Sequence, residues 1–384
     1  MRGSERLRRL WASSAEKGRL DGVLVMLILL LVTVGSVMVA SASYAYAESR
    51  YNDAGYFTRK QILFVALGIL VMLGVSRISP KLWWRITPAA YAVTVVLLLC
   101  TLAFGLTGNG AQRWIALGPL TFQPSELAKL TLVLMLARYF GAFGEKVTAK
   151  AKGRLLYGIV YPLGITGLLC LLVVLQRHLS GLIIIATIGI SVMFLSGSSK
   201  KVLGLLCGTG ILGVGALALT LEYARERITV WLNPAAYPLE GGWQTLQGMM
   251  AIGSGGFFGL GLGNSRLKYS WVSEPANDFI FTITCEELGF LGAAVILLLF
   301  FLFIRRGYRV ALGNDDAFSR IVALGITTKV AIQVLLNVAV ITNTIPNTGI
   351  SLPFFSYGGT SLLVLFLEMG ILLSISRESV LSYR

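Results

Sequence analysis

The sequence has 384 residues, of which 55% are hydrophobic and only 13% are charged. Soluble domains carry about 25% charged residues, so this composition excludes an ordinary soluble enzyme and a disordered chain and indicates a protein dissolved in lipid. The formal net charge of +15 would also suit a nucleic-acid-binding protein, and the positions of the cations decide between these classes. The four cysteines form no CxxC pair, so neither a disulfide framework nor a zinc site is indicated. His178 is the only histidine, which excludes a histidine-based catalytic set and a metal site built from several imidazoles.

Ten hydrophobic runs are long enough to cross a bilayer as helices, because about 20 apolar residues span the hydrocarbon core. We therefore predict an all-α, polytopic membrane protein. The predicted spans are 22–43, 61–76, 86–106, 124–142, 155–175, 179–197, 202–221, 279–304, 321–343 and 359–376. The first run is followed by further spans, so we expect it to remain in the membrane and not to act as a cleavable signal peptide.

The lysines and arginines set the orientation, since short cytoplasmic loops carry an excess of both. With the N-terminus inside, 22 of the 33 lie in inner loops and nine in outer loops. Both termini are therefore predicted to be cytoplasmic, and a nucleic-acid partner is not expected. The predicted organisation is a basic N-terminal segment (1–21), a membrane domain (22–376) and a cytoplasmic tail (377–384), with a large outer loop (222–278) between the seventh and eighth spans.

The fourth span carries polar residues that need an explanation. Gln123, Glu126 and Lys129 are spaced by three, so they share one helix face, and Glu126 can pair with Lys129. A charge within a span costs roughly 2.5–3.5 kcal/mol on insertion scales and is a functional hypothesis by default. The pair either closes two helices structurally or faces a water-filled cavity that holds a polar or anionic substrate.

Asp278 lies where the large outer loop meets the eighth span, and Glu286 and Glu287 follow within that span. A carboxylate at such a boundary can have water on one side and apolar walls on the other, an environment that makes a usable general base. The alternative is that Asp278 only caps the helix, as aspartate commonly does. The spacing alone does not decide between these interpretations.

Two glycine-rich segments have different interpretations. The last outer loop, 344–361, contains glycines and prolines that require a fixed irregular backbone, which either binds a phosphate through its N–H groups or only packs as a re-entrant loop. In Gly253–Gly263 no strand precedes the glycines and no Lys-Ser/Thr follows, so neither a Rossmann nor a P-loop nucleotide site is expected. We interpret His178 and Lys329 as structural residues.

Five segments in this order resemble the SEDS family (shape, elongation, division and sporulation), whose members include FtsW, RodA and SpoVE. They are VASAS (Val39–Ser43), NGAQRWIALGPLTFQPSELAKL (Asn109–Leu130), GGWQTLQGMMAIGSGGFFGLGLGNSRLK (Gly241–Lys268), DFIFTITCEELGFLG (Asp278–Gly292) and NTGISLPFFSYGGTSLL (Asn347–Leu363). The GGWQ segment and the first two spans resemble the FtsW and SpoVE branch more than the RodA branch.

The resemblance implies a ten-helix peptidoglycan glycosyltransferase that polymerises lipid II on the outer face of the bacterial cytoplasmic membrane. It implies that Asp278 is the essential aspartate and that polar motif positions near a cavity bind substrate. The expected substrate-binding residues are Arg113, Gln123, Glu126, Lys129, Lys268, Glu274 and Ser356. The implied partners are an undecaprenyl-pyrophosphate-linked glycan, a class B penicillin-binding protein and membrane proteins of the divisome or elongasome.

Two segments depart from the family pattern. Between the fifth and sixth spans, Arg177 and His178 stand where members commonly have Pro and Asp. The segment before Asp278 reads Val-Ser-Glu-Pro-Ala-Asn and not the common Leu-Pro-Glu followed by His or Gln. These departures bear on how the acceptor and the partner are bound, and Lys329 is not at a position that is typically charged in the family.

The mechanism implied by the resemblance uses Asp278 as general base for attack of an acceptor hydroxyl on the donor sugar. Undecaprenyl pyrophosphate leaves, and its developing charge needs cations, which Arg113 with Arg227 or Lys268 could supply, or a divalent ion such as Mg or Mn. Two alternatives remain: a flippase that moves lipid II between leaflets, and a scaffold that activates the transpeptidase.

Overall fold

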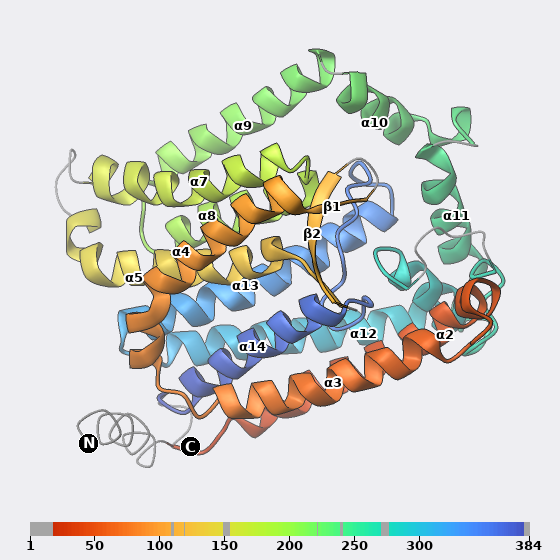
Figure 1. Ribbon diagram of the computed structural model, residues 1–384, viewed down its shortest axis with the longest axis horizontal. Coiled ribbons are helices and arrows are strands. Elements are labelled where there is room, and N and C mark those ends of the chain that lie inside the picture. Colours follow the sequence, from red (N-terminus) through yellow and green to blue (C-terminus); the bar gives the residue numbers. More distant parts are fainter. Residues whose placement is uncertain are drawn as a thin grey trace.

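The structure is a computed structural model that describes residues 18–108, 111–118, 120–148, 154–220, 222–238, 241–269 and 276–379. Most of these residues are helical, and Figure 1 shows the long helices running alongside one another as a bundle. The helices of the first half are α2 (Gly22–Tyr51), α3 (Tyr56–Val75), α4 (Pro80–Phe104), α5 (Pro124–Thr148), the π-helix η1 (Leu156–Val160), α7 (Tyr161–Leu175), α8 (Leu179–Leu195) and α9 (Lys200–Thr220).

The second half of the chain begins with short helices and ends with long ones. These are α10 (Glu222–Leu232), the 3-10 helix η2 (Pro234–Ala236), α11 (Gly241–Ser254), α12 (Ile280–Leu312), α13 (Ala317–Ile341) and α14 (Gly359–Ser376). The outer loop predicted over 222–278 therefore contains α10, η2 and α11. Figure 1 shows α10 and α11 together at one end of the bundle.

Every predicted span lies on a helix, and eight helices in the described part of the chain are long and apolar enough to cross a membrane. Of the other two predicted spans, α8 is a shorter apolar helix of 17 residues and α9 has 21 residues. The all-α polytopic membrane fold is thus confirmed, and the number of ten spans stays a prediction. Several helices are longer than predicted: α2 continues to Tyr51 and α12 to Leu312.

The centre of the bundle is formed by α13 and α14, whose residues are mostly buried against α3, α5, α8 and α12. Small residues allow close approach, which drives packing where lipid provides no hydrophobic force between helices. A Cβ atom on Gly325 of α13 would lie 2.5 Å from the Val133 side chain on α5. On α14, a Cβ on Gly370 would lie 2.7 Å from Val75 on α3.

A small antiparallel sheet was not predicted by the sequence. The strands β1 (Leu106–Gly108), β2 (Ala111–Leu117) and β3 (Leu120–Phe122) pair in the order β1-β2-β3 between α4 and α5. The turn from β2 to β3 uses Gly118 at φ +62°, a conformation that glycine adopts without a steric cost. Short strands with glycine-rich turns give only a weak periodic signal, so the sequence pattern did not indicate this sheet.

Helix α12 contains a break at Gly289, where φ is +67° and ψ is −170°. The segment after α11 lies against the break, because Leu260 and Gly261 donate backbone hydrogen bonds to the carbonyls of Glu286 and Glu287 at 3.0 and 2.9 Å. The glycine-rich segment 253–263 therefore leaves α11 as a loop that packs against α12. The break fixes the direction in which the first turns of α12 run toward the outer loop.

Candidate active site

Asp278 lies in the turn that leads into α12 and is partly exposed. The helix begins at Ile280 and its N-cap position is occupied by Phe279, so the interpretation of Asp278 as the N-cap residue is wrong. The Asp278 carbonyl accepts a hydrogen bond of 2.9 Å from Asn337 Nδ2, on the fully buried face of α13. Asp278 is therefore anchored through its backbone to the centre of the bundle.

The turn that carries Asp278 is bound to the last outer loop by a series of hydrogen bonds. Ser356 Oγ donates to the Asn277 carbonyl at 2.9 Å, and the Tyr357 amide donates to the Ala276 carbonyl at 2.8 Å. Ser356 Oγ also accepts from the Leu352 amide at 2.7 Å. The predicted substrate-binding residue Ser356 thus holds the two segments together.

The backbone of the same loop lies beside the Asp278 carboxyl. A Cβ atom placed on Gly349 would be 2.8 Å from Asp278 Oδ2, so only a residue without a side chain fits there with the present geometry. Gly349 also has φ +67°, in the left-handed region that favours glycine. The glycines of this loop therefore allow backbone to approach a carboxylate, a placement that the sequence did not reveal.

The polar residues of the fourth predicted span form the expected pair. Lys129 Nζ lies 2.6 Å from Glu126 Oε2, within the apolar helix α5, and the two side chains are 2% and 13% exposed. Gln123, which precedes the helix, is buried and accepts a backbone hydrogen bond from Glu126 at 3.1 Å. The i,i+3 spacing was enough to predict this ion pair.

A second buried ion pair lies close to the first and was missed by the sequence analysis. Lys329 Nζ on α13 lies 2.6 Å from Glu368 Oε2 on α14, with side chains that are 3% and 1% exposed. The sequence does place a lysine in one span and a glutamate in another, and each would need a partner because an unpaired charge in lipid is costly. Spacing along the chain does not connect two residues on different helices.

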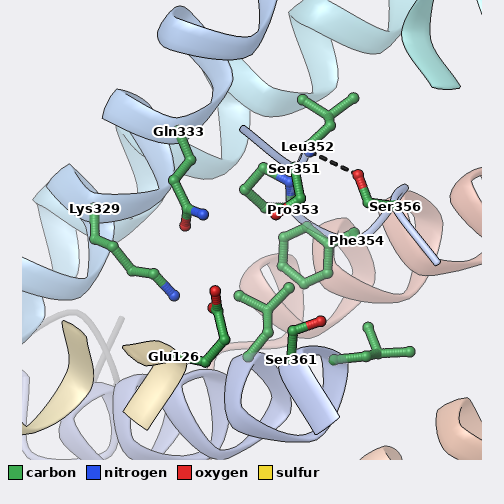
Figure 2. Close-up of a pocket in the computed structure, with 11 residues that line it drawn as sticks. Glu126, Lys329, Gln333, Ser351, Leu352, Pro353, Phe354, Ser356 and Ser361 are labelled. Carbon is green, nitrogen blue, oxygen red and sulfur yellow. Dashed lines mark hydrogen bonds between the residues drawn. The ribbon is translucent and has the colours of Figure 1, made fainter. Parts of the chain in front are cut away.

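A small pocket of about 30 Å³, enough for one or two water molecules, lies between these ion pairs and the last outer loop. Its lining includes Glu126, Lys329, Gln333, Ser356 and Ser361. Figure 2 shows the Lys329 ammonium and the Glu126 carboxylate pointing toward one another across it. Glu126 is thus paired with Lys129 along one helix and also lines this pocket, while a contact with substrate stays a prediction.

Arg113 lies on β2 and is partly buried. Its charge acts on His178, in the turn between α7 and α8, where burial and then Arg113 lower the histidine pKa to about 3. Glu126 acts in the opposite direction on the same imidazole. His178 is therefore neutral at physiological pH, and the departure from the family pattern at this turn lies within electrostatic reach of Arg113 and Glu126.

Lys268 is placed differently from the other predicted site residues. Its ammonium is 2% exposed and lies 2.9 Å from Glu287 Oε1, 2.6 Å from the Gly263 carbonyl and 3.3 Å from Ser41 Oγ. Ser41 also donates to Glu287, at 2.7 Å. These contacts hold the glycine-rich segment between α2 and α12.

The remaining predicted residues are Arg227 and Glu274. Arg227 on α10 is partly buried, and its Nη1 donates to the Asn347 carbonyl at 3.0 Å, in the loop beside Asp278. Glu274 lies outside the described residues. Among the residues that the structure does describe, no three His, Cys, Asp or Glu side chains are grouped closely enough to hold a metal ion.

Comparison with known proteins places this arrangement among bacterial cell-wall proteins. The model of a cell cycle protein family, FtsW/RodA/SpoVE, matches residues 22–381. The stage V sporulation protein E of Bacillus subtilis is 38% identical over 362 residues, which cover 94% of this chain and 97% of the relative. A probable peptidoglycan glycosyltransferase FtsW of Trichlorobacter lovleyi is 36% identical over 361 residues, covering 93% of both.

Solved structures share the fold over the same extent. A chain from a peptidoglycan synthase complex that coordinates polymerization and crosslinking matches with a TM-score of 0.78 and 28% identity, covering 94% of this chain and 98% of that one. The rod shape determining protein RodA of Thermus thermophilus matches with a TM-score of 0.69 and 27% identity, with the same coverage. The likeness therefore includes nearly the whole membrane domain.

Proposed function

The chain belongs to the cell cycle protein family of FtsW, RodA and SpoVE, and on this basis we propose that it is a peptidoglycan glycosyltransferase with Asp278 as general base. It polymerises lipid II into glycan strands at the outer face of the cytoplasmic membrane. The observation that carries the proposal is the position of Asp278. The carboxyl is partly exposed, its backbone is anchored to the buried Asn337, and loop backbone lies against it.

In the proposed reaction the 4-hydroxyl of the acceptor's GlcNAc attacks the anomeric carbon of the donor. Asp278 accepts the hydroxyl proton while the new C–O bond forms and the bond to undecaprenyl pyrophosphate breaks. General-base assistance of this kind contributes about 10²–10⁴-fold to a rate. A rigid backbone around the carboxylate supports this role, because catalytic groups act only when they are held in position.

The leaving pyrophosphate needs positive charge on the same side of the site. Arg227 fits this role because its guanidinium contacts Asn347, two residues before the glycine that lies beside Asp278. Arg113 on β2 is the second proposed cation. The described residues contain no group of three His, Cys, Asp or Glu side chains that could hold a metal ion. A requirement for a divalent ion such as Mg or Mn stays a prediction.

The buried polar cavity suits the part of the substrate that enters the membrane domain. Glu126, which is paired with Lys129, lines this cavity from the start of α5, and Lys329 faces it. Gln123 directly precedes the same helix. We assign to this region the binding of polar head-group atoms, while the lipid tails of both substrates stay in the bilayer. A transporter would also use intramembrane charges, which makes lipid II flipping the second candidate function.

The likeness to a chain of a peptidoglycan synthase complex supports a partner that crosslinks the strands. The proposed partner is a class B penicillin-binding protein, together with membrane proteins of the divisome or elongasome. The excess of lysine and arginine in alternate loops supports an orientation with both termini in the cytoplasm. In that orientation Asp278 faces the outside, where the glycan is made.

The test of the function is glycan synthesis from lipid II by the purified protein, with and without a class B partner. Asp278→Asn should lower the polymerisation rate by about 10²–10⁴-fold, because the amide cannot accept the proton. Asp53→Asn is the matched control, since Asp53 is another outer-face aspartate and is 34% exposed. It should leave the rate unchanged.

Three results would contradict the proposal in different ways. Full activity of Asp278→Asn would show that Asp278 is not the general base. Movement of labelled lipid II across vesicle membranes without any lengthening of glycan indicates a flippase. Normal growth of cells that carry Asp278→Asn, with the partner still bound, indicates a scaffold.

A further inference from the structure

The loop before the Gly349 turn is held by side chains from two helices, α10 and α8. Trp231 on α10 donates its indole N–H to the Asn343 carbonyl at 2.9 Å, and Asn343 Nδ2 donates back to the Trp231 carbonyl at 3.2 Å. Arg227, also on α10, donates to the Asn347 carbonyl, and Ser180 on α8 donates to the Thr348 carbonyl. These hydrogen bonds tie α10 and α8 to the loop.

Asn347 makes two side-chain contacts that run toward Asp278. Its Nδ2 donates to Gln244 Oε1 on α11 at 2.9 Å, and its Oδ1 accepts from the Gly349 amide at 3.2 Å. The second contact is an asparagine bond to the backbone two residues on, which fixes a turn. That turn puts Gly349 beside the Asp278 carboxyl.

The two contacts depend on each other through the chemistry of an amide. An asparagine side chain has one carbonyl oxygen and one NH₂ group, so an oxygen facing Gly349 requires the NH₂ group to face elsewhere. Gln244 Oε1 is an acceptor, so it binds the NH₂ group of Asn347 and not its oxygen. With its oxygen toward Asn347, Gln244 thereby supports the Asn347 orientation that stabilises the Gly349 turn.

Displacement of this turn reaches Asp278 through a second connection. Asn337 Nδ2 donates to the Asp278 carbonyl at 2.9 Å and to the Ile350 carbonyl at 2.7 Å, so one amide joins the two segments. Ile350 follows Gly349 directly. A shift of the loop is therefore transmitted to the Asp278 backbone as well as to the space around its carboxyl.

We propose that Asn347 is a positioning residue that sets the Asp278 carboxyl through the Gly349 turn, with Gln244 on α11 fixing its amide. The proposal rests on the proposed function of Asp278. It makes α11 part of the machinery that orients the base.

The test compares steady-state kinetics of lipid II polymerisation for Asn347→Leu, Gln244→Leu and the double variant. A misplacement of about 1 Å can cost about 10²-fold in rate, so kcat should fall about 10- to 100-fold while KM stays within about twofold. Because both residues act through one contact, the double variant should be little worse than Asn347→Leu alone.

A rescue and a control separate positioning from general damage to the loop. Asn347→Asp keeps an oxygen for the Gly349 amide, and the Gln244 amide can rotate to donate to the other oxygen, so most of kcat should return. Trp231→Phe removes a hydrogen bond to the same loop four residues before Asn347. It should leave kcat within about twofold. Thermal unfolding of each variant checks that the membrane domain is folded.

The proposal is overturned if Asn347→Leu keeps its kcat, or if Trp231→Phe loses as much activity as Asn347→Leu. If Asn347→Leu does not fold, Asn347→Ser is the substitute, since its hydroxyl still offers an acceptor but cannot bind Gln244 as the amide does. Full activity of Asn347→Ser then overturns the role of Gln244. If Asp278→Asn is inactive and Asn347→Leu is fully active, the positioning role of Asn347 is rejected. The proposed function of Asp278 is then unaffected.

Discussion

At the scale of single residues, the charges inside the bundle separate into two kinds of pair. Glu126 and Lys129 belong to one helix and compensate each other locally, whereas Lys329 and Glu368 come from two helices and compensate only after those helices pack. Both pairs are nearly inaccessible to solvent. The folded protein is therefore stable only if each buried charge keeps its partner.

The Lys329–Glu368 pair gives a prediction about stability. Breaking a buried pair by removing one partner costs about 3–5 kcal/mol, whereas replacing both with apolar residues is often neutral or stabilising. Lys329→Met and Glu368→Leu should each lower the thermal unfolding temperature of the protein in nanodiscs, and the double variant should recover it.

The ion pair of Arg59 with Asp53 is the control, since its side chains are 67% and 34% exposed. Surface pairs contribute about 0–1 kcal/mol, so Asp53→Asn should change the unfolding temperature little. A double variant of Lys329 and Glu368 that is less stable than either single variant would contradict the prediction.

At the scale of elements, the break in α12 shows how a glycine can redirect a helix. A Cβ atom on Gly289 would lie 2.3 Å from the Gly259 amide nitrogen and 2.6 Å from the Phe258 carbonyl carbon. The positive φ adds strain for any other residue. The segment 253–263 can therefore pack against the break in α12 only because residue 289 is a glycine.

Gly289→Ala should destabilise the protein strongly, by more than the roughly 1 kcal/mol that separates glycine from alanine in an ordinary helix. Gly164→Ala on α7 is the matched control, because nothing lies within 4 Å of the added Cβ. Thermal unfolding of the two variants measures the difference. Equal unfolding temperatures would show that the segment 253–263 yields easily to the added methyl group.

The elements also show where sequence patterns stop being informative. The i,i+3 spacing predicted the Glu126–Lys129 pair because both residues lie on one helix, whose geometry is known in advance. Nothing local predicted the partner of Lys329, since Glu368 lies 39 residues further on another helix. The break at Gly289 was missed for a related reason: membrane helices tolerate glycine, and only contact with the distant Gly259 requires the positive φ here.

At the scale of the whole molecule, composition and hydropathy were sufficient for the fold class. The ten apolar runs all lie on helices, and the family resemblance drawn from five motifs is confirmed by the match over residues 22–381. The role of Asp278 depended on that resemblance, because its position in the sequence also suited a helix cap. The contacts of Asn347 and Gly349 required the structure, since they join segments that no periodic pattern relates.

The orientation of the whole chain gives a further prediction. In a variant without native cysteines, Ser49→Cys should react in intact spheroplasts with a maleimide that does not cross membranes, and Asp315→Cys should react only after permeabilisation. Both positions are exposed at helix ends, near the ends of α2 and α12. The reverse labelling would place Asp278 on the cytoplasmic side and remove the proposed site of glycan synthesis.

The pairing of Lys329 with Glu368 also has a consequence for biogenesis. During translation α13 emerges before α14, so the lysine reaches the translocon while its glutamate is still to be made. Entry of that helix into lipid alone would carry a penalty of roughly 2.5–3.5 kcal/mol for the ammonium. The last two helices are thus expected to leave the translocon as a hairpin, and a chain truncated before α14 would be recognised by membrane quality control as incomplete.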